Sequence, residues 1–225
     1  MARFGRAFPM LVSNPRARVV YDTTGAGAIS SNTHGTSFSW THNISGNAVI
    51  VGANLFGQYG GGSVFISSIK IGTTSLNLIG SNQYISTYAF TSYFYGLVNP
   101  PTGSQTFTVS VNNGSGYLTG IAVNSVSYFN VSSFGTMATA TGSGTSVAQT
   151  INGINSKNRV VNMIFPGTNG TISGYNQTQR YNVPGANAVY VANLLGDAPG
   201  ASSVGFSATC ASGAWSSVAV PLISC

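Results

Sequence analysis

The sequence predicts an all-β protein, folded as an antiparallel β-sandwich of the jelly-roll or immunoglobulin-like type. Runs of four to ten residues rich in Val, Ile, Phe and Tyr alternate apolar with small or polar side chains. Most of the 29 glycines gather in short clusters between these runs, where turns require them. No long stretch keeps the 3.6-residue period of an amphipathic helix. Together these observations favour strands joined by turns.

The clearest strands are expected, in chain order, at 47–56, 63–71, 105–111 and 119–129. Between the second and third of them, Asn99–Gly103 reads as a turn, because two prolines fix φ and a glycine follows. At one strand per 8–12 residues, the chain should contain about ten to twelve strands.

The last part of the chain predicts a hairpin whose arms are 202–210 and 214–223. Such a hairpin places Cys210 at its turn and Cys225 at its other end, about 30 Å away at 3.3 Å per residue. A disulfide needs Cα atoms less than about 7 Å apart. We therefore expect two free thiols, as in a reducing cytoplasm, unless Cys225 bonds to another chain.

Two segments of the chain resemble each other. NAVIVGANLFG at 47–57 and NAVYVANLLG at 187–196 match once one residue is removed. Either the segments record a duplicated unit, or strand residues recur by chance. The sequence leaves both explanations open.

Charge divides the chain into an arm, 1–18, and a single sandwich domain, 19–225. Only 4% of the residues are charged, whereas 43% are hydrophobic, so the chain can fill a core. The net charge is +4 on the arm and +2 on the body. The body carries Lys70, Lys157, Arg159 and Arg180 against Asp22 and Asp197.

The arm is expected to be an extended peptide that docks on a neighbouring protein. Pro9 and Pro15 favour an extended chain, and arginine and aromatic side chains serve well as anchors. We do not expect nucleic-acid binding, because the nearly neutral body offers no basic face. The arm lacks the apolar run of a secretory signal, and no membrane span is expected. The candidate docking residues are Arg3, Phe4, Arg6, Phe8, Arg16 and Arg18.

The sequence predicts no enzyme. It contains no Glu, and both of its acids, Asp22 and Asp197, are flanked by turn residues and expected in loops. A catalytic triad would need one of these acids with His34 or His42, yet no G-x-S-x-G elbow presents a serine. The two histidines have no Cys or acid close by in sequence, so no metal site is expected. Dinucleotide and Walker motifs are absent, so no cofactor is expected.

The succession of strands resembles a known group of proteins. FSWTHNISGNAVIVGANLF (38–56), ISSIKIGTTSLNLIG (66–80), YFYGLVNPPTGSQTFTVSV (93–111) and GAWSSVAVPLI (213–223) are similar to a β-sandwich in virion proteins of tailed actinobacterial phages. MARFGRAFP resembles the start of proteins from the same phages. The resemblance implies a non-enzymatic virion component, a minor tail protein or capsid decoration protein assembled in the host cytoplasm. It provides no catalytic residues to carry over, and the low charge departs from the commoner members.

Two functions therefore compete. In the first, the protein is an assembly element that binds other virion proteins, either capsid or tail subunits. In the second, the sandwich binds a host surface glycan, with Trp40, Trp215, Tyr93 and Tyr95 as stacking platforms. The alternative role for each tryptophan is core filling. Lys70 and Lys157 are the only lysines that could protect sheet edges. We therefore expect the edges to be covered by the chain itself or by neighbouring copies, with a homotrimer or another symmetric cluster as the favoured arrangement.

Overall fold

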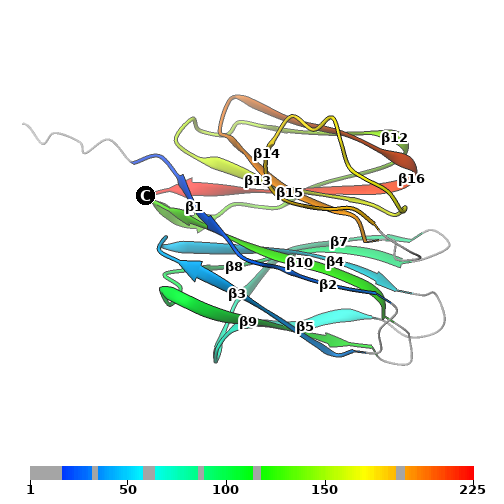
Figure 1. Ribbon diagram of the computed structural model, residues 1–225. Helices are drawn as coiled ribbons and strands as arrows, with labels where there is room; N and C mark the ends of the chain where they lie inside the picture. The colour runs from blue at the N-terminus through cyan, green and yellow to red at the C-terminus, as the bar shows by residue number, and fades with distance from the viewer. Residues whose placement is uncertain (1–16, 32–34, 58–63, 86–88, 114–117, 186–190) are drawn as a thin grey trace, which may run out of the picture.

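The computed structural model describes residues 17–31, 35–57, 64–85, 89–113, 118–185 and 191–225, and it confirms the predicted antiparallel all-β sandwich (Figure 1). The described residues form sixteen strands and no helix. The strands are β1 (Val20–Thr24), β2 (Ala28–Ser31), β3 (Ser37–Ile44), β4 (Ala48–Gly57), β5 (Phe65–Ile71), β6 (Thr74–Ser75), β7 (Asn77–Ile85), β8 (Ala89–Val98), β9 (Gly103–Asn112), β10 (Leu118–Phe129), β11 (Val131–Phe134), β12 (Ala138–Asn152), β13 (Arg159–Pro166), β14 (Thr178–Val183), β15 (Asn193–Pro199) and β16 (Ser203–Ser224).

Residues 19–129 form a first sandwich unit of two sheets. One sheet has the order β1-β10-β4-β8-β7, with β2 also on β10, and the other has the order β3-β9-β5-β6. The pairs are nested, because β2 pairs with β10, β3 with β9, β4 with β8 and β5 with β6. A long antiparallel hairpin rolled into two sheets gives this nesting, which is the jelly-roll arrangement.

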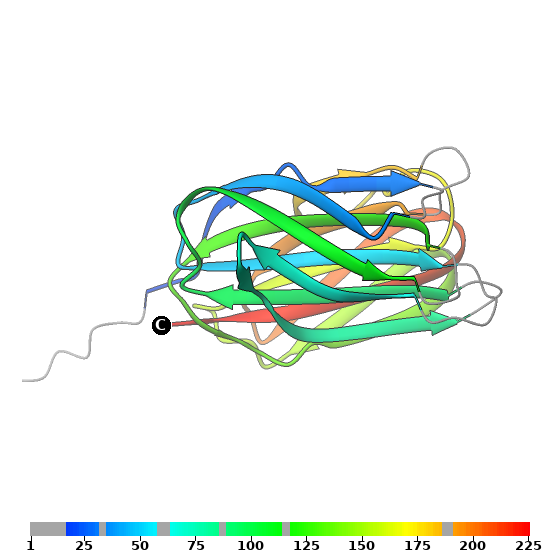
Figure 2. The same ribbon diagram turned by 90° about the horizontal axis from the view of Figure 1, so that it is seen from below.

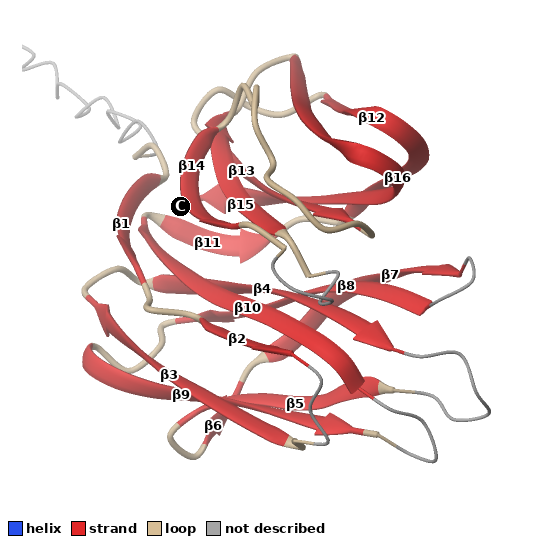
Figure 3. Cartoon of the chain, turned by 45° about the vertical axis from the view of Figure 1, so that its right-hand side comes forward, coloured by secondary structure: helices blue, strands red, loops and turns tan. Residues whose placement is uncertain are grey.

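Residues 131–225 form a second unit with the same strand arrangement, in which two strands, β12 and β16, are long. The second unit has the order β11-β16-β13-β15-β14, with β12 also on β16. Phe206 and Ala219 of β16 lie in one core cluster with Val160, although a straight strand would separate the first two by about 43 Å. The β12–β16 ribbon therefore folds back over its own sheet (Figure 3).

The expected C-terminal hairpin is therefore wrong. Ser203–Ser224 is one continuous strand, and its two parts pair with β12 rather than with each other. The expected free thiols are confirmed within the chain, since Cys210 is buried and Cys225 exposed, and neither is in a disulfide.

Matching backbone contacts identify equivalent positions in the two units. The Asn99 amide donates to the Asn47 carbonyl at 2.7 Å, and the Gly200 amide donates to the Asn158 carbonyl at 2.9 Å. Each asparagine side chain also accepts a backbone N–H, from Val131 just after the first unit at 3.1 Å for Asn47, and from Ser224 at the end of the second unit at 3.0 Å for Asn158. This equivalence aligns β4 with β13, β8 with β15, and β10 with the second part of β16.

The similar segments noted in the sequence do not mark this repeat. The sequence match would make β4 equivalent to β15, but these strands hold different positions in the two units. Residues 187–190 of the second segment lie outside the described part of the chain. The structure thus adds an internal repeat to the single sandwich that the sequence predicted, and a different strand alignment reveals it.

The two units pack face to face through the β4 and β13 sheets. Strand β4 is buried along its whole length: Val49 and Val51 face the core of the first unit, whereas Ile50 joins the core between the units. A Cβ on Gly52 would lie 2.8 Å from the Met163 sulfur, so glycine provides the hollow that this methionine fills. Figures 1 and 2 show the strands of both units running along the same long axis.

Candidate functional site

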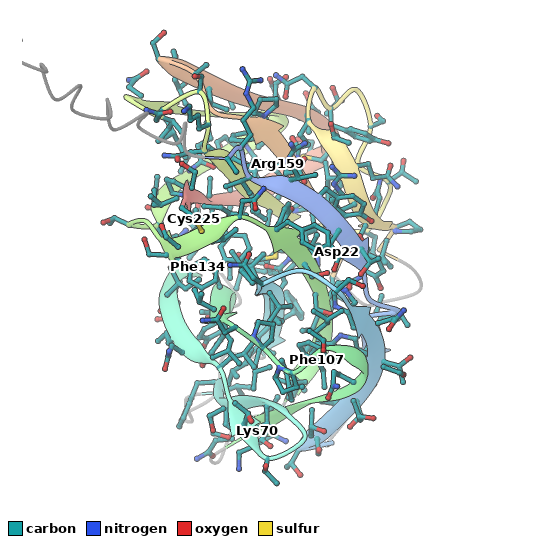
Figure 4. All side chains as sticks on the ribbon, turned by 90° about the vertical axis from the view of Figure 1, so that its left-hand side faces the viewer. Asp22, Lys70, Phe107, Phe134, Arg159 and Cys225 are labelled. Atoms are coloured by element: carbon teal, nitrogen blue, oxygen red, sulfur yellow. The ribbon has the colours of Figure 1, made fainter. Side chains whose placement is uncertain are left out.

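Both ends of the described chain meet at one end of the molecule, which we call the terminal end (Figures 1 and 2). Asn130, which joins the two units at φ 63°, donates from its side chain to the Arg18 carbonyl at 2.8 Å. Its own carbonyl accepts the Cys225 amide at 3.1 Å, and the Val19 amide donates to the Lys157 carbonyl at 2.9 Å. Both units therefore fix the base of the arm, and Figure 4 looks onto this end.

The surface beside the base of the arm is apolar and basic. Val20 and Phe129 are cross-strand partners and remain 50% and 37% exposed, and Arg18 is exposed too. Five of the six predicted docking residues lie outside the described residues, namely Arg3, Phe4, Arg6, Phe8 and Arg16. Arg18 is the one whose position is described, at the point where the arm leaves the body.

Asp197 joins the two units through a cluster of charged and aromatic groups. Its carboxylate accepts from Arg159 at 2.7 Å and from Arg180 at 2.7 Å, and the Tyr128 hydroxyl of the first unit donates to it at 2.8 Å. The Arg180 guanidinium also lies 3.6 Å from the centre of the Tyr21 ring. Burial, followed by the Asp197 charge, raises the pKa of Tyr128 well above its usual value. The phenol therefore stays protonated and donates.

The expectation that both acids lie in loops is wrong. Asp197 lies within β15 and is fully buried, and Asp22 lies within β1. Two of the four body cations, Arg159 and Arg180, pair with the Asp197 carboxylate.

A second polar cluster lies where β1, β3 and β10 meet. Asp22 accepts the Ser127 hydroxyl at 2.7 Å and the Ser45 and Gly46 amides at 2.8 and 2.7 Å. His42 bonds to Ser125 at 2.8 Å through Nδ1, and its Nε2 lies 3.2 Å from the Ser127 hydroxyl. The structure thus brings Asp22 and His42, two of the residues considered for a triad, together with two serines. His34 lies outside the described residues.

The hydrogen-bond directions in this cluster differ from those of a catalytic triad. The carboxylate binds a serine and not the histidine, so it does not orient the imidazole as a triad acid does. The Ser127 hydroxyl donates to Asp22 and the Thr23 hydroxyl donates to the Asn43 carbonyl, so both oxygens face Nε2 as acceptors. The imidazole proton therefore lies on Nε2, and Nδ1 accepts from Ser125. His42 is 2% exposed and both serines are fully buried. The cluster is arranged to join three strands.

Burial lowers the pKa of His42 to about 4, although the nearby Asp22 charge and a hydrogen bond partly oppose the shift. The unfolded chain thus binds this proton near pH 6.5, whereas the folded chain resists it until about pH 4. We expect the free energy of unfolding to fall by about 2–3 kcal/mol as the pH drops through this window. Denaturant titrations at several pH values measure the fall. His42→Gln should remove most of it, and an unchanged pH dependence in that variant would contradict this assignment; His34→Gln is the matched control.

The predicted stacking residues lie in the core. Trp40, Trp215, Tyr93 and Tyr95 are 4%, 9%, 7% and 6% exposed. Trp40 stacks on Phe107 with ring centres 5.2 Å apart, and the Tyr95 hydroxyl donates to the Ile66 carbonyl at 3.3 Å. Buried rings offer no face to a sugar, so the structure places them in the core-filling role considered for the tryptophans.

Within the described ranges, no three His, Cys, Asp or Glu side chains gather as a metal would require. None of the described elements is a helix long and apolar enough to cross a membrane. The chain matches no known family model, no curated protein and no solved structure.

Proposed function

We propose that the protein is a non-catalytic structural component of a phage virion, a minor tail protein or capsid decoration protein, attached through residues 1–18. One observation carries the proposal: both units fix the base of the arm at the terminal end, next to the exposed Val20–Phe129 pair. A peptide with a fixed base loses less freedom on docking than one that leaves a mobile loop.

Two further features support an assembly role. The jelly-roll is frequent among viral capsid and lectin domains, which is an analogy at the level of the fold alone. The polar groups that resemble a catalytic set, His42 with its two serines, are buried and engaged with one another.

The arrangement of edges supports assembly with copies of the same chain. Among the strands that the structure describes, β7 pairs only with β8 along its nine residues. Lys70 lies on β5 where the two-residue strand β6 pairs with it, and Lys157 lies between β12 and β13, so neither lysine lies on β7. We infer that neighbouring subunits cover the edges in a trimer or another symmetric cluster.

The Cys225 thiol tests which end attaches. Cys225 is exposed at the terminal end and Cys210 is buried, so a maleimide should label Cys225 in the free protein. If this end docks, labelling in purified particles should slow at least tenfold. The matched control is Ser212→Cys in a Cys225→Ser background, because residue 212 lies at the fold of the β12–β16 ribbon, about 40 Å along the strand from the C-terminus. Equal Cys225 labelling in free and assembled protein would contradict the proposal.

A further inference from the structure

The core of the second unit contains a layer of buried polar side chains. The Asn162 amide donates to Gln149 Oε1 at 3.0 Å and to the Ser217 hydroxyl at 2.9 Å. It also accepts from Gln177 Nε2 at 2.9 Å, and the Ser217 hydroxyl donates to Gln149 Oε1 at 2.7 Å. None of these four side chains is more than 6% exposed. They form one enclosed network, which we call the amide layer, and it joins β12, β13, β16 and the residue before β14.

The amide layer divides the core of the second unit. On β13, Asn162 lies between Ile164 of one apolar cluster and Val160 of another. Gln149 on β12 and Ser217 on β16 lie between members of the same two clusters. Each of these strands therefore changes from apolar to polar and back to apolar within the core.

The internal repeat gives the amide layer a counterpart in the first unit. The bulges of β7 and β14 support the alignment, because they fall at equivalent residues, Ile79 and Arg180. The same register matches Gly96 to Asp197. Each residue of β13, β15 and the second part of β16 thus has an equivalent in β4, β8 or β10.

The first unit is apolar where the second unit is polar. The second unit has Asn162, Gln177, Gly196 and Ser217 where the first has Val51, Leu76, Tyr95 and Val123, in that order. The four residues of the first unit lie together in one apolar cluster. The fold therefore does not require polar groups at these places.

Two atoms of the amide layer have no hydrogen-bond partner among the described residues. They are Gln149 Nε2, which is a donor, and Gln177 Oε1, which is an acceptor. Both belong to amides that are bonded to the Asn162 side chain, so both lie beside its amide group. A buried polar atom without a partner is costly, and native proteins rarely leave one unpaired. We propose that ordered water lies in the amide layer and links Gln149 Nε2 to Gln177 Oε1.

The chemistry and the space of the layer both select water. Water accepts a hydrogen bond from an amide N–H and donates one to an amide oxygen, as these two atoms require. An ion would be buried without a counter-charge, because the side chains of the layer are neutral. The first unit fills this region with two side chains, Leu76 and Tyr95. The second unit fills it with Gln177, which lies against Gly196, and thereby leaves space for water.

NMR of the isolated, ¹⁵N-labelled protein tests this inference independently of any particle. We expect cross-relaxation peaks between water and the Gln149 side-chain amide protons, with the sign of a long-lived water molecule. Gln177→Leu, which restores the residue type of the first unit, should remove these peaks. Gln179→Leu is the matched control, because it makes the same change at an exposed residue of β14 and should leave the peaks in place.

Ser217→Ala distinguishes bound water from a hydroxyl proton that exchanges with the solvent. The peaks should persist in this variant, and their loss would overturn the proposal, because the hydroxyl would then be their source. Absence of the peaks in the wild-type protein would overturn it too, as would their persistence in Gln177→Leu. If Gln177→Leu does not fold, a high-resolution crystal structure of the wild-type protein decides. It should show a water about 2.7–3.2 Å from Gln149 Nε2, and a dry layer would contradict the proposal.

Discussion

Replacing Asp197 with Asn should lower the free energy of unfolding by about 3–5 kcal/mol. The carboxylate is fully buried and holds two arginines and the Tyr128 hydroxyl. An amide keeps the shape of the side chain but leaves Arg159 and Arg180 without a counter-charge at 17% and 14% side-chain exposure. Removing one partner of a buried pair is costly because the other charge stays desolvated. Guanidinium titration followed by tryptophan fluorescence measures the change.

Asp22→Asn is the matched control. It makes the same change of charge at a partly exposed carboxylate that accepts three hydrogen bonds and contacts no arginine in the described structure. Its effect should be clearly smaller than that of Asp197→Asn. Equal losses in the two variants would contradict the view that the Asp197 cluster fastens the two units together.

Asp22 should also contribute to acid sensitivity. Partial burial raises its pKa, but the Ser127, Ser45 and Gly46 hydrogen bonds lower it further, so the net pKa lies below the usual value. The stabilisation is therefore complete above the unfolded pKa near 4 and is lost as the pH falls through the folded pKa. This loss begins where the His42 effect ends, so acid titration should show two successive phases.

The sequence predicted the parts of the fold that depend on local patterns. The four clearest strands appear as β4, β5, β9 and β10, and the predicted turn lies between β8 and β9, with Gly103 at φ 81°. Sixteen strands exceed the ten to twelve expected, partly because β2, β6 and β11 have four residues or fewer. So short a run carries too few alternations for a period to be recognised.

The burial of Asp197 was not predictable from its neighbours. Gly196 and Pro199 looked like turn residues, yet Gly196 is a strand residue on which a Cβ would lie 2.5 Å from Gln177. Close packing therefore requires this glycine, and sequence alone does not distinguish that need from a turn. The fold-back of β16 was not predictable from the sequence either, because its two parts pair with β12 and not with each other.

The polar clusters depend on contacts between distant parts of the chain. Ser127 lies 105 residues from Asp22, and Tyr128 lies 69 residues from Asp197. Their meeting follows from strand order, which no local pattern encodes. The internal repeat was equally obscured, since the equivalent residues Gly96 and Asp197, or Ile79 and Arg180, share no side-chain chemistry.

The most direct test of the proposed assembly role is the incorporation of a protein that lacks residues 2–16. Arg18 and Val19 remain in this variant, and their contacts with Asn130 and Lys157 keep the base of the arm in place. The body should therefore fold with an unchanged unfolding midpoint. A second variant replaces residues 2–16 with a Gly-Ser segment of equal length. It distinguishes a requirement for the arginine and phenylalanine side chains from a requirement for the length of the arm alone. Quantitative mass spectrometry of purified particles should show both variants at less than a tenth of wild-type occupancy; incorporation of the truncated protein at wild-type occupancy would contradict attachment through the arm.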